Sequence, residues 1–170
     1  MKALTIYFSH VGETIINNEI KELTKGNTAK VAEKIKEFTE CDLYEIEPLE
    51  AYPSKYEDCL RIAKKEAKED IRPEYKKVDL NFGNYDVIYL GYPIWEGSFP
   101  RIIASFLANQ DFKGKIVKPF STHGGSTSGY SDLELKGLIK NGDVKEILSL
   151  QAEKIVNDDI DELIGWVFDY

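Results

Sequence analysis

The stretch Asp86-Val87-Ile88-Tyr89-Leu90-Gly91-Tyr92-Pro93 is the segment of this chain that most clearly indicates its fold. It is rich in β-branched and aromatic residues, which favour a pleated and buried backbone. It stops at a proline, which cannot donate a hydrogen bond to a neighbouring strand. The sequence therefore predicts a strand over residues 86–92, followed directly by a loop.

Outward from this strand, strand-like and helix-like segments alternate along the chain. Further strands are predicted at Ala3–Phe8, Asp42–Glu47, Lys115–Phe120 and Lys145–Leu150. Helical spacing of apolar residues predicts helices from Thr28 to near Cys41, over Ser54–Asp70, Ser98–Ala108 and Asn157–Phe168, and from Ser131, where Ser131 and Glu134 match a capping box. Such alternation is typical of an α/β fold, a doubly wound five-stranded parallel sheet with helices on both faces.

Length and charge limit the possible functions. The 170 residues, 42% of them hydrophobic, suffice for a single domain over residues 1–170. The net charge of −8 would repel nucleic acid and anionic membranes, so we expect neither as a partner. Any bound phosphate would have to be held by backbone N–H groups rather than by a basic cluster.

Two cysteines without a CxxC motif predict neither a disulfide framework nor a structural zinc site. The apolar run at the N-terminus is shorter than a signal or membrane-spanning segment. We therefore expect a protein of the reducing cytoplasm.

The first candidate loop, after the strand Ala3–Phe8, offers two possible phosphate cradles. The contiguous one, Ser9 to Thr14, would place the Glu13 carboxylate beside the phosphate. The other joins Ser9 to the helix start at Asn27, Thr28 and Ala29, which offers N–H groups and the positive end of a helix dipole. We favour the second cradle, although Gly26-Asn27 as an ordinary helix cap is the simpler interpretation.

The favoured cradle leaves an excursion, Val11–Lys25, between its two halves. Ile15, Ile16, Ile20 and Leu23 are expected to form an amphipathic turn that folds over the phosphate or contacts a second subunit in a homodimer.

Two more loops follow predicted strands. In one, Pro93, Ile94 and Trp95 could cover a planar ligand, or Trp95 could simply close a hydrophobic lid over the sheet edge. The other contains Thr122, His123, Gly124 and Gly125, whose glycines allow close approach of a ligand and whose hydroxyl can bind its polar edges. His123 has no partner at the spacing of a catalytic triad, and His10 and His123 lack zinc-ligand spacing. We therefore expect no catalytic residue and no metal site.

Taken together, YFSH…GNTAKVAEKI, DVIYLGYPIWEGSFPRIIASFL and FSTHGGS resemble the flavodoxin-like family of FMN proteins over nearly the whole chain. The resemblance implies the strand order 2-1-3-4-5 and non-covalently bound FMN. It implies that Ser9, Asn27, Thr28 and Ala29 bind the phosphate and that Pro93, Ile94 and Trp95 contact the ring. It further implies that Thr122, His123, Gly124 and Gly125 contact the ribityl chain and ring edge, with His10 a weaker contact.

The expected function is electron transfer through FMN, with the net charge of −8 lowering the potential of the fully reduced flavin. A redox protein with a basic surface would dock near Trp95. One alternative is an NAD(P)H-dependent FMN oxidoreductase of the quinone reductase type, with NAD(P)H or a quinone as partner. A second is a non-redox signalling or scaffold domain, although Ser9-His10 and Tyr92-Pro93 stand where a receiver domain would need acids.

Overall fold

A parallel sheet built around the predicted central strand organises the molecule. The computed structural model describes residues 1–170. The strands of the sheet are β1 (Ala3–Tyr7), β4 (Asp42–Glu45), β5 (Val87–Pro93), β6 (Ile116–His123), β7 (Asp143–Val144) and β8 (Leu148–Gln151). Their order is β4-β1-β5-β6-β7, with β8 pairing to β6 further along, and all pairs are parallel. The order expected for the five predicted strands is therefore confirmed. The fifth strand, predicted at Lys145–Leu150, is replaced by two short strands, β7 before Lys145 and β8 from Leu148 onward.

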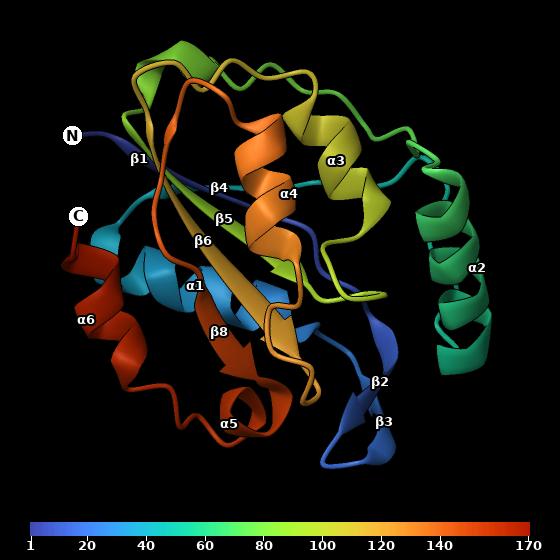
Figure 1. Ribbon diagram of the computed structural model, residues 1–170. Helices are drawn as coiled ribbons and strands as arrows, with labels where there is room; N and C mark the ends of the chain where they lie inside the picture. The colour runs from blue at the N-terminus through green and yellow to red at the C-terminus, as the bar shows by residue number, and fades with distance from the viewer.

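Helices cover both faces of the sheet (Figure 1). On one face lie α3 (Arg101–Leu107) and α4 (Ser131–Leu138), and on the other lie α1 (Asn27–Thr39), α5 (Ala152–Val156) and α6 (Glu162–Phe168). The longest helix, α2 (Tyr56–Glu69), stands at the edge of the molecule beside α3 and β2, and a short 3₁₀ turn spans Phe82–Asn84. None of these helices has the length and apolar character needed to span a bilayer.

The continuous apolar run in β5 is explained by burial on both faces. Ile88, Leu90 and Tyr92 belong to the core beneath α3 and α4. Val87 and Tyr89 belong to the core beneath α1 and α6. Because successive side chains of a strand point to opposite faces, a central strand with two cores must be apolar throughout.

The excursion in the first loop is a β-hairpin, so the expected amphipathic turn is wrong. Strands β2 (Gly12–Ile16) and β3 (Glu19–Leu23) pair antiparallel through a two-residue turn at Asn17 and Asn18. The two asparagines have φ values of 52° and 61°, as a type I′ turn requires. Figure 1 shows the hairpin beyond the arrowheads of β5 and β6.

Two further details of the predicted helices are wrong. The helix expected over Asn157–Phe168 begins only at Glu162, because Asp158 adopts a φ of 55° that no helix continues. The Ser131 hydroxyl does not cap its helix. Instead it donates to the Ser128 carbonyl oxygen at 2.8 Å and accepts a hydrogen bond from the Tyr92 hydroxyl at 3.1 Å.

A buried lysine fastens the C-terminus to the sheet. Lys118 on β6 is 1% exposed, and its ammonium group donates hydrogen bonds to the carbonyl oxygens of Trp166 and Asp169. It also lies over the Trp166 ring, 4.9 Å from the centroid. Burial lowers the pKa of Lys118. The carbonyls at the end of α6 supply the partners that a buried cation needs.

Candidate functional site

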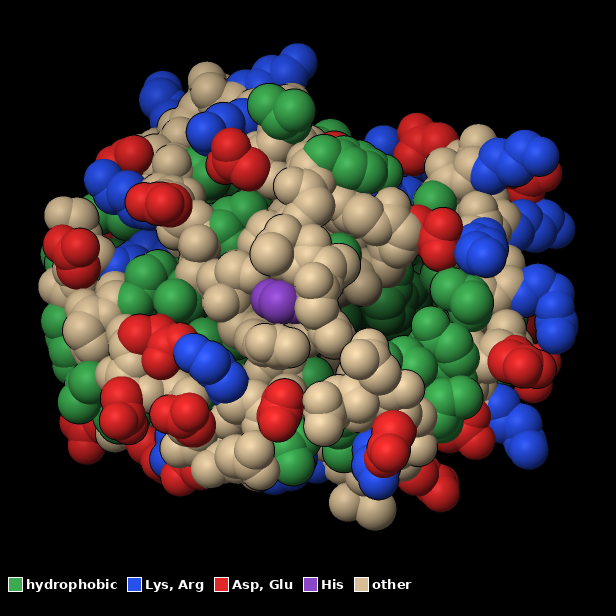
Figure 2. Space-filling view, turned by 60° about the horizontal axis from the view of Figure 1, so that its bottom comes forward, with side chains coloured by type: hydrophobic (Ala, Val, Ile, Leu, Met, Phe, Trp, Pro, Cys, Tyr) green, Lys and Arg blue, Asp and Glu red, His purple; other side chains and the backbone are tan.

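The three predicted loops meet around one cleft at the carboxyl ends of the strands. The cleft has a volume of about 490 Å³ and is lined by all of the predicted contact residues except Ser9 and Ala29. Figure 2 shows the surface hollowed, with hydrophobic side chains on the floor of the hollow. This is the edge at which doubly wound sheets bind their ligands, and the volume suits a ligand of drug-like size.

Ser9 and Ala29 lie just behind the cleft and join the two halves of the split cradle. The backbone N–H of Ala29 donates to the Ser9 hydroxyl oxygen at 3.1 Å. A side chain at Gly26 would collide with that hydroxyl, so the close approach requires glycine. The amides of Asn27 and Thr28, in the first turn of α1, have no acceptor within the helix.

Asn27 carries the clearest sign of a ligand-binding site. The residue is 9% exposed, and its Oδ1 atom has no hydrogen-bond partner within the protein. A buried polar atom without a partner costs free energy, and Asn27 and Thr28, whose amides are also free, both line the cleft. A ligand that carries hydroxyl groups and a phosphate would satisfy both the oxygen and the amides.

The contiguous cradle is disfavoured by the direction of Glu13. Its Oε2 atom accepts a hydrogen bond from the Tyr56 N–H at 2.8 Å, at the start of α2. The carboxylate is therefore held by α2 rather than by the helix start of α1.

Direct hydrogen bonds connect the loops to one another. The hydroxyl oxygens of Thr28 and Thr122 lie 2.9 Å apart and link the first loop to the third. The backbone N–H of Ile94 donates to the Thr122 carbonyl oxygen at 2.9 Å and links the second loop to the third. Thr122 thus sets the relative positions of all three loops.

Trp95 takes part in an aromatic cluster and also lines the cleft. Its ring packs edge-on against those of Tyr52, Phe8 and His10, with centroid distances of 4.9, 5.4 and 5.7 Å. The His10 Nε2–H donates to the Pro53 carbonyl oxygen at 2.8 Å, which fixes that ring. Trp95 therefore closes a hydrophobic cluster and also lines the cleft.

The tautomer of His123 follows from its hydrogen bonds. Its Nδ1 atom accepts from the backbone N–H of Gly125 at 3.0 Å and of Thr127 at 3.2 Å. Burial lowers the pKa of His123, so the ring is neutral at neutral pH. The proton then resides on Nε2, which is free to donate a hydrogen bond into the cleft.

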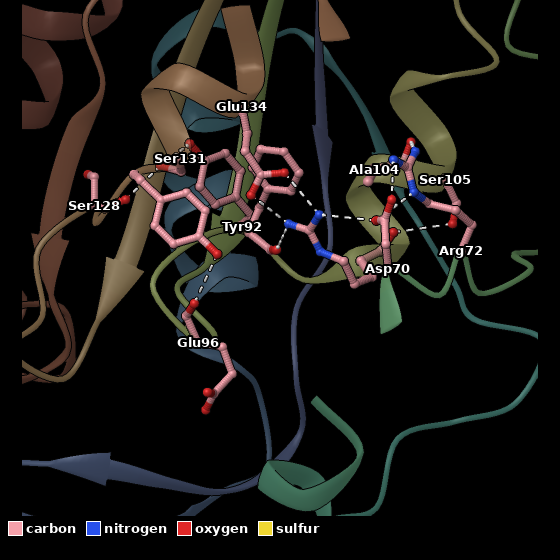
Figure 3. Close-up of polar contacts among 12 residues, drawn as sticks. Asp70, Arg72, Tyr92, Glu96, Ala104, Ser105, Ser128, Ser131 and Glu134 are labelled. Atoms are coloured by element: carbon pink, nitrogen blue, oxygen red, sulfur yellow. Dashed lines mark hydrogen bonds and ion pairs between the residues drawn. The ribbon is translucent and has the colours of Figure 1, made fainter. Parts of the chain in front are cut away.

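A polar network beneath the second and third loops was not predicted from the sequence. Figure 3 shows Tyr92, Ser131 and Ser128 joined in one chain of hydrogen bonds, with Glu134 beside them. The Arg101 guanidinium donates to both carboxylate oxygens of Glu134 at 2.9 Å. Because Arg101 begins α3 and Glu134 lies in α4, this pair joins the helices that follow the two loops.

A second set of residues lining the cleft was not among the predicted contact residues, although Ile15 lies in the excursion expected to fold over the phosphate. The set comes from the hairpin and from α2, and includes Glu13, Ile15, Tyr56, Cys59, Leu60 and Ala63. The apolar stripe on α2 was visible in the sequence, but nothing there showed that the stripe would face the cleft.

The donors around the cleft suit a phosphate ester joined to a planar ring. Neutral hydroxyls and helix-start amides can hold the phosphate, Trp95 can contact a ring, and His123 can donate to its edge. No cluster of His, Cys, Asp or Glu side chains is arranged to hold a metal ion.

Comparisons with known proteins identify relatives of the same fold. The family model described as Flavodoxin matches residues 20–168. The chain is 33% identical to a candidate flavoprotein from Bacteroides eggerthii, with 95% of this chain and 97% of that chain covered and a TM-score of 0.71. A candidate flavoprotein from Bacteroides uniformis is 28% identical, with coverage of 99% and 98% and a TM-score of 0.75.

A Lactobacillus acidophilus flavoprotein, solved in complex with FMN, shares the fold. It is 22% identical, with coverage of 92% and 97% and a TM-score of 0.64. None of the curated proteins matches the chain.

Proposed function

The chain belongs to the flavodoxin family, and from that premise we propose that it is an FMN-binding flavoprotein that transfers electrons through its cofactor. The observation that carries the proposal is the convergence of three linked loops on one cleft. At this cleft the buried Asn27 Oδ1 atom and the amides of Asn27 and Thr28 at the start of α1 have no hydrogen-bond partner within the protein. FMN has the phosphate, polyol and planar ring for which these loops are suited.

Each loop has a distinct role toward FMN. The Ser9 hydroxyl and the amides of Asn27 and Thr28 hold the phosphate, with Ala29 positioning Ser9 through its backbone N–H and His10 beside them. Pro93, Ile94 and Trp95 contact the ring, and Thr122, His123, Gly124 and Gly125 contact the ribityl chain and ring edge. FMN, when bound, supplies the capacity to take up and release one or two electrons.

The residues of the chain orient the cofactor and set its electrostatic surroundings. The neutral His123 donates from Nε2, and the aromatic cluster keeps Trp95 in place against the cleft. Electrons would be exchanged with a redox protein or with a small molecule of the NAD(P)H or quinone type, reached through the open side of the cleft.

FMN binding is tested with an Asn27→Asp variant. The substitution keeps the size of the side chain and places a carboxylate beside the phosphate, so we expect FMN affinity to fall roughly tenfold or more. Riboflavin, which lacks the phosphate, should bind both proteins equally. The exposed Asn157→Asp variant carries the same charge change away from the site and serves as the control.

Absorption spectroscopy and fluorescence titration of the reconstituted protein give both affinities. A wild-type protein that is colourless and cannot be reconstituted with FMN would overturn the proposal. Equal losses of FMN and riboflavin affinity in Asn27→Asp would contradict the assigned phosphate cradle.

A further inference from the structure

The side of the cleft formed by α2 has no role in the assigned cofactor contacts. Cys59, Leu60 and Ala63 line it, and none of them belongs to the three loops. They lie at successive positions and one turn apart, so they form a single apolar wall. Burial, and then the charge of Glu66, raises the pKa of the Cys59 thiol to about 11, so the wall is uncharged at neutral pH.

The wall is held in place by the hairpin. The Glu13 N–H donates to the Ser54 carbonyl oxygen at 2.7 Å, and the Glu13 carboxylate accepts from the Tyr56 N–H at 2.8 Å. Gly12 adopts a φ of 127°, and a side chain there would collide with the Ser54 backbone. Hairpin and α2 are therefore fitted together, and the space between them is a built part of the cleft.

A second link holds α2 from the side of the aromatic cluster. The Tyr52 hydroxyl donates to Oε1 of the buried Glu66 at 2.7 Å, and the Tyr52 ring packs against Trp95. The apolar wall therefore stands at a fixed position beside the residue assigned to the flavin ring.

Charge restricts what can enter this space. No lysine or arginine lines the cleft, whereas Glu13 and Glu96 do. A pyrophosphate group would meet no cation there and would approach against a net charge of −8. The pyridine dinucleotides are therefore poor candidates, and an uncharged molecule with a flat apolar surface is a good one.

We propose that the space between α2 and the second loop is a binding compartment for a small, uncharged, planar ring compound of the quinone class, adjacent to the cofactor. The inference rests on the proposed function, because a compound bound in the compartment can exchange electrons with this protein only if FMN is bound by the three loops. The redox partner is then a small molecule rather than a protein or a dinucleotide.

The test measures binding to the oxidised, FMN-loaded protein, with no reductant present. Equilibrium dialysis compares hydroxymethyl-anthraquinone, which is uncharged, with anthraquinone sulfonate, which has the same ring system and a negative charge. We expect saturable binding of the uncharged probe and binding of the sulfonate weaker by about tenfold. NADPH is expected not to compete with the uncharged probe.

Two variants locate the compartment. Ala63→Phe should fill the compartment and weaken binding of the uncharged probe by about tenfold or more, while the FMN content of the protein stays unchanged. Leu60→Lys should reverse the preference in favour of the sulfonate, because it places a cation on the wall. Ile62→Phe, on a surface of α2 that does not line this cleft, is the matched control. It should change neither the binding of the two probes nor the FMN content.

The possible failures are distinct. Absence of FMN from the wild-type protein removes the proposed function itself. FMN present, with probe binding unchanged in both Ala63→Phe and Leu60→Lys, overturns the compartment alone. Loss of FMN from Ala63→Phe and Leu60→Lys, but not from Ile62→Phe, would assign the wall to the cofactor and also overturn the proposal.

Discussion

The Ser9 hydroxyl oxygen accepts a hydrogen bond at 3.1 Å from the backbone N–H of Ala29, twenty positions further along the chain. This bond brings together the two halves of the phosphate cradle across the intervening hairpin. It also occupies the Ala29 amide, so that the amides of Asn27 and Thr28 are the donors left for the phosphate. The Ser9 proton remains available, because its oxygen acts as the acceptor.

The negative charge at the cleft should lower the reduction potential of the bound flavin. We expect the second reduction step to lie below that of free FMN, and Glu96→Gln to raise it by tens of millivolts, because Glu96 lines the cleft. Redox titration at low ionic strength measures both quantities. Glu69→Gln, on the exposed surface of α2, should change the potential less, since salt screens distant charges. A potential well above that of free FMN would refute the expectation.

The ion pair between Arg101 and Glu134 should contribute strongly to stability. Their side chains are only 10% and 24% exposed. Burial, the largest single influence, raises the pKa of Glu134, but the hydrogen bonds that its carboxylate accepts and the positive charge of Arg101 together outweigh burial and hold the pKa below its ordinary value. Arg101→Met leaves a carboxylate without its partner, so we expect a loss of about 3 kcal/mol in the free energy of unfolding.

Urea denaturation measures this loss, and the double variant Arg101→Met/Glu134→Leu provides the comparison. Removing both charges should restore much of the stability, because no unpaired charge then remains buried. A double variant as unstable as the single one would show that packing rather than charge is responsible.

Glu66 should destabilise the protein when it is ionised. Burial raises the pKa of this carboxyl despite the opposing effects of the Tyr52 hydrogen bond and Arg101. Because the pKa of Glu66 is higher in the folded protein than in the unfolded chain, its protonated carboxyl favours the folded state. This contribution to stability is fully present below the pKa of the unfolded chain and is lost as the pH rises through the pKa of the folded protein. Glu66→Gln retains an acceptor for Tyr52, so we expect it to be more stable than wild type near neutral pH.

The difference between Glu66→Gln and wild type should shrink as the pH falls toward about 4.5, which denaturant titrations at several pH values would reveal. Glu69→Gln, exposed on the same helix, should show no such pH dependence. A Glu66→Gln variant less stable than wild type at every pH would contradict the argument.

Tyr7 should make the fold sensitive to alkali. Burial, and then the charges of Glu45 and Glu33, raises its pKa to about 12 from an ordinary value of 10.0. Its contribution to stability is therefore complete below pH 10 and is lost as the pH rises through the folded-state value. Thermal melts above pH 10 should show a shallower decline for Tyr7→Phe than for wild type, whereas Tyr130→Phe should follow wild type. Parallel declines for all three would exclude this role for Tyr7.

The local pattern of apolar residues, prolines and glycines along the sequence was sufficient to predict the sheet and the three loops. The apolar run in β5 and the positions of Pro93, Trp95 and His123 after strands depend on neighbours in sequence, and the fold places all of them at one edge. The pairing of Ser9 with the start of α1 was also predicted, because a carboxylate at Glu13 made the contiguous alternative unfavourable.

Features that depend on distant contacts or on turn geometry could not be predicted in this way. The isoleucines in the excursion suggested an amphipathic turn, but Asn17 and Asn18 readily adopt positive φ and close a hairpin instead. The pairing of Arg101 with Glu134 and the orientation of α2 toward the cleft depend on how separate helices pack. Neither leaves a periodic signal in the sequence.

The hairpin begins and ends at nearly the same point in space, since a β-carbon on Gly26 would lie 2.5 Å from the His10 carbonyl oxygen. Its two ends are therefore fixed by the cradle and not by the length of the chain between them. Gly12 and Glu13 at the base of the hairpin are tied to Ser54 and Tyr56, so we expect only its outer part, around Asn17 and Asn18, to tolerate a change in length, at small entropic cost and without displacing the phosphate cradle. Evolution could thus alter which molecules reach the cofactor while leaving the means of holding that cofactor untouched.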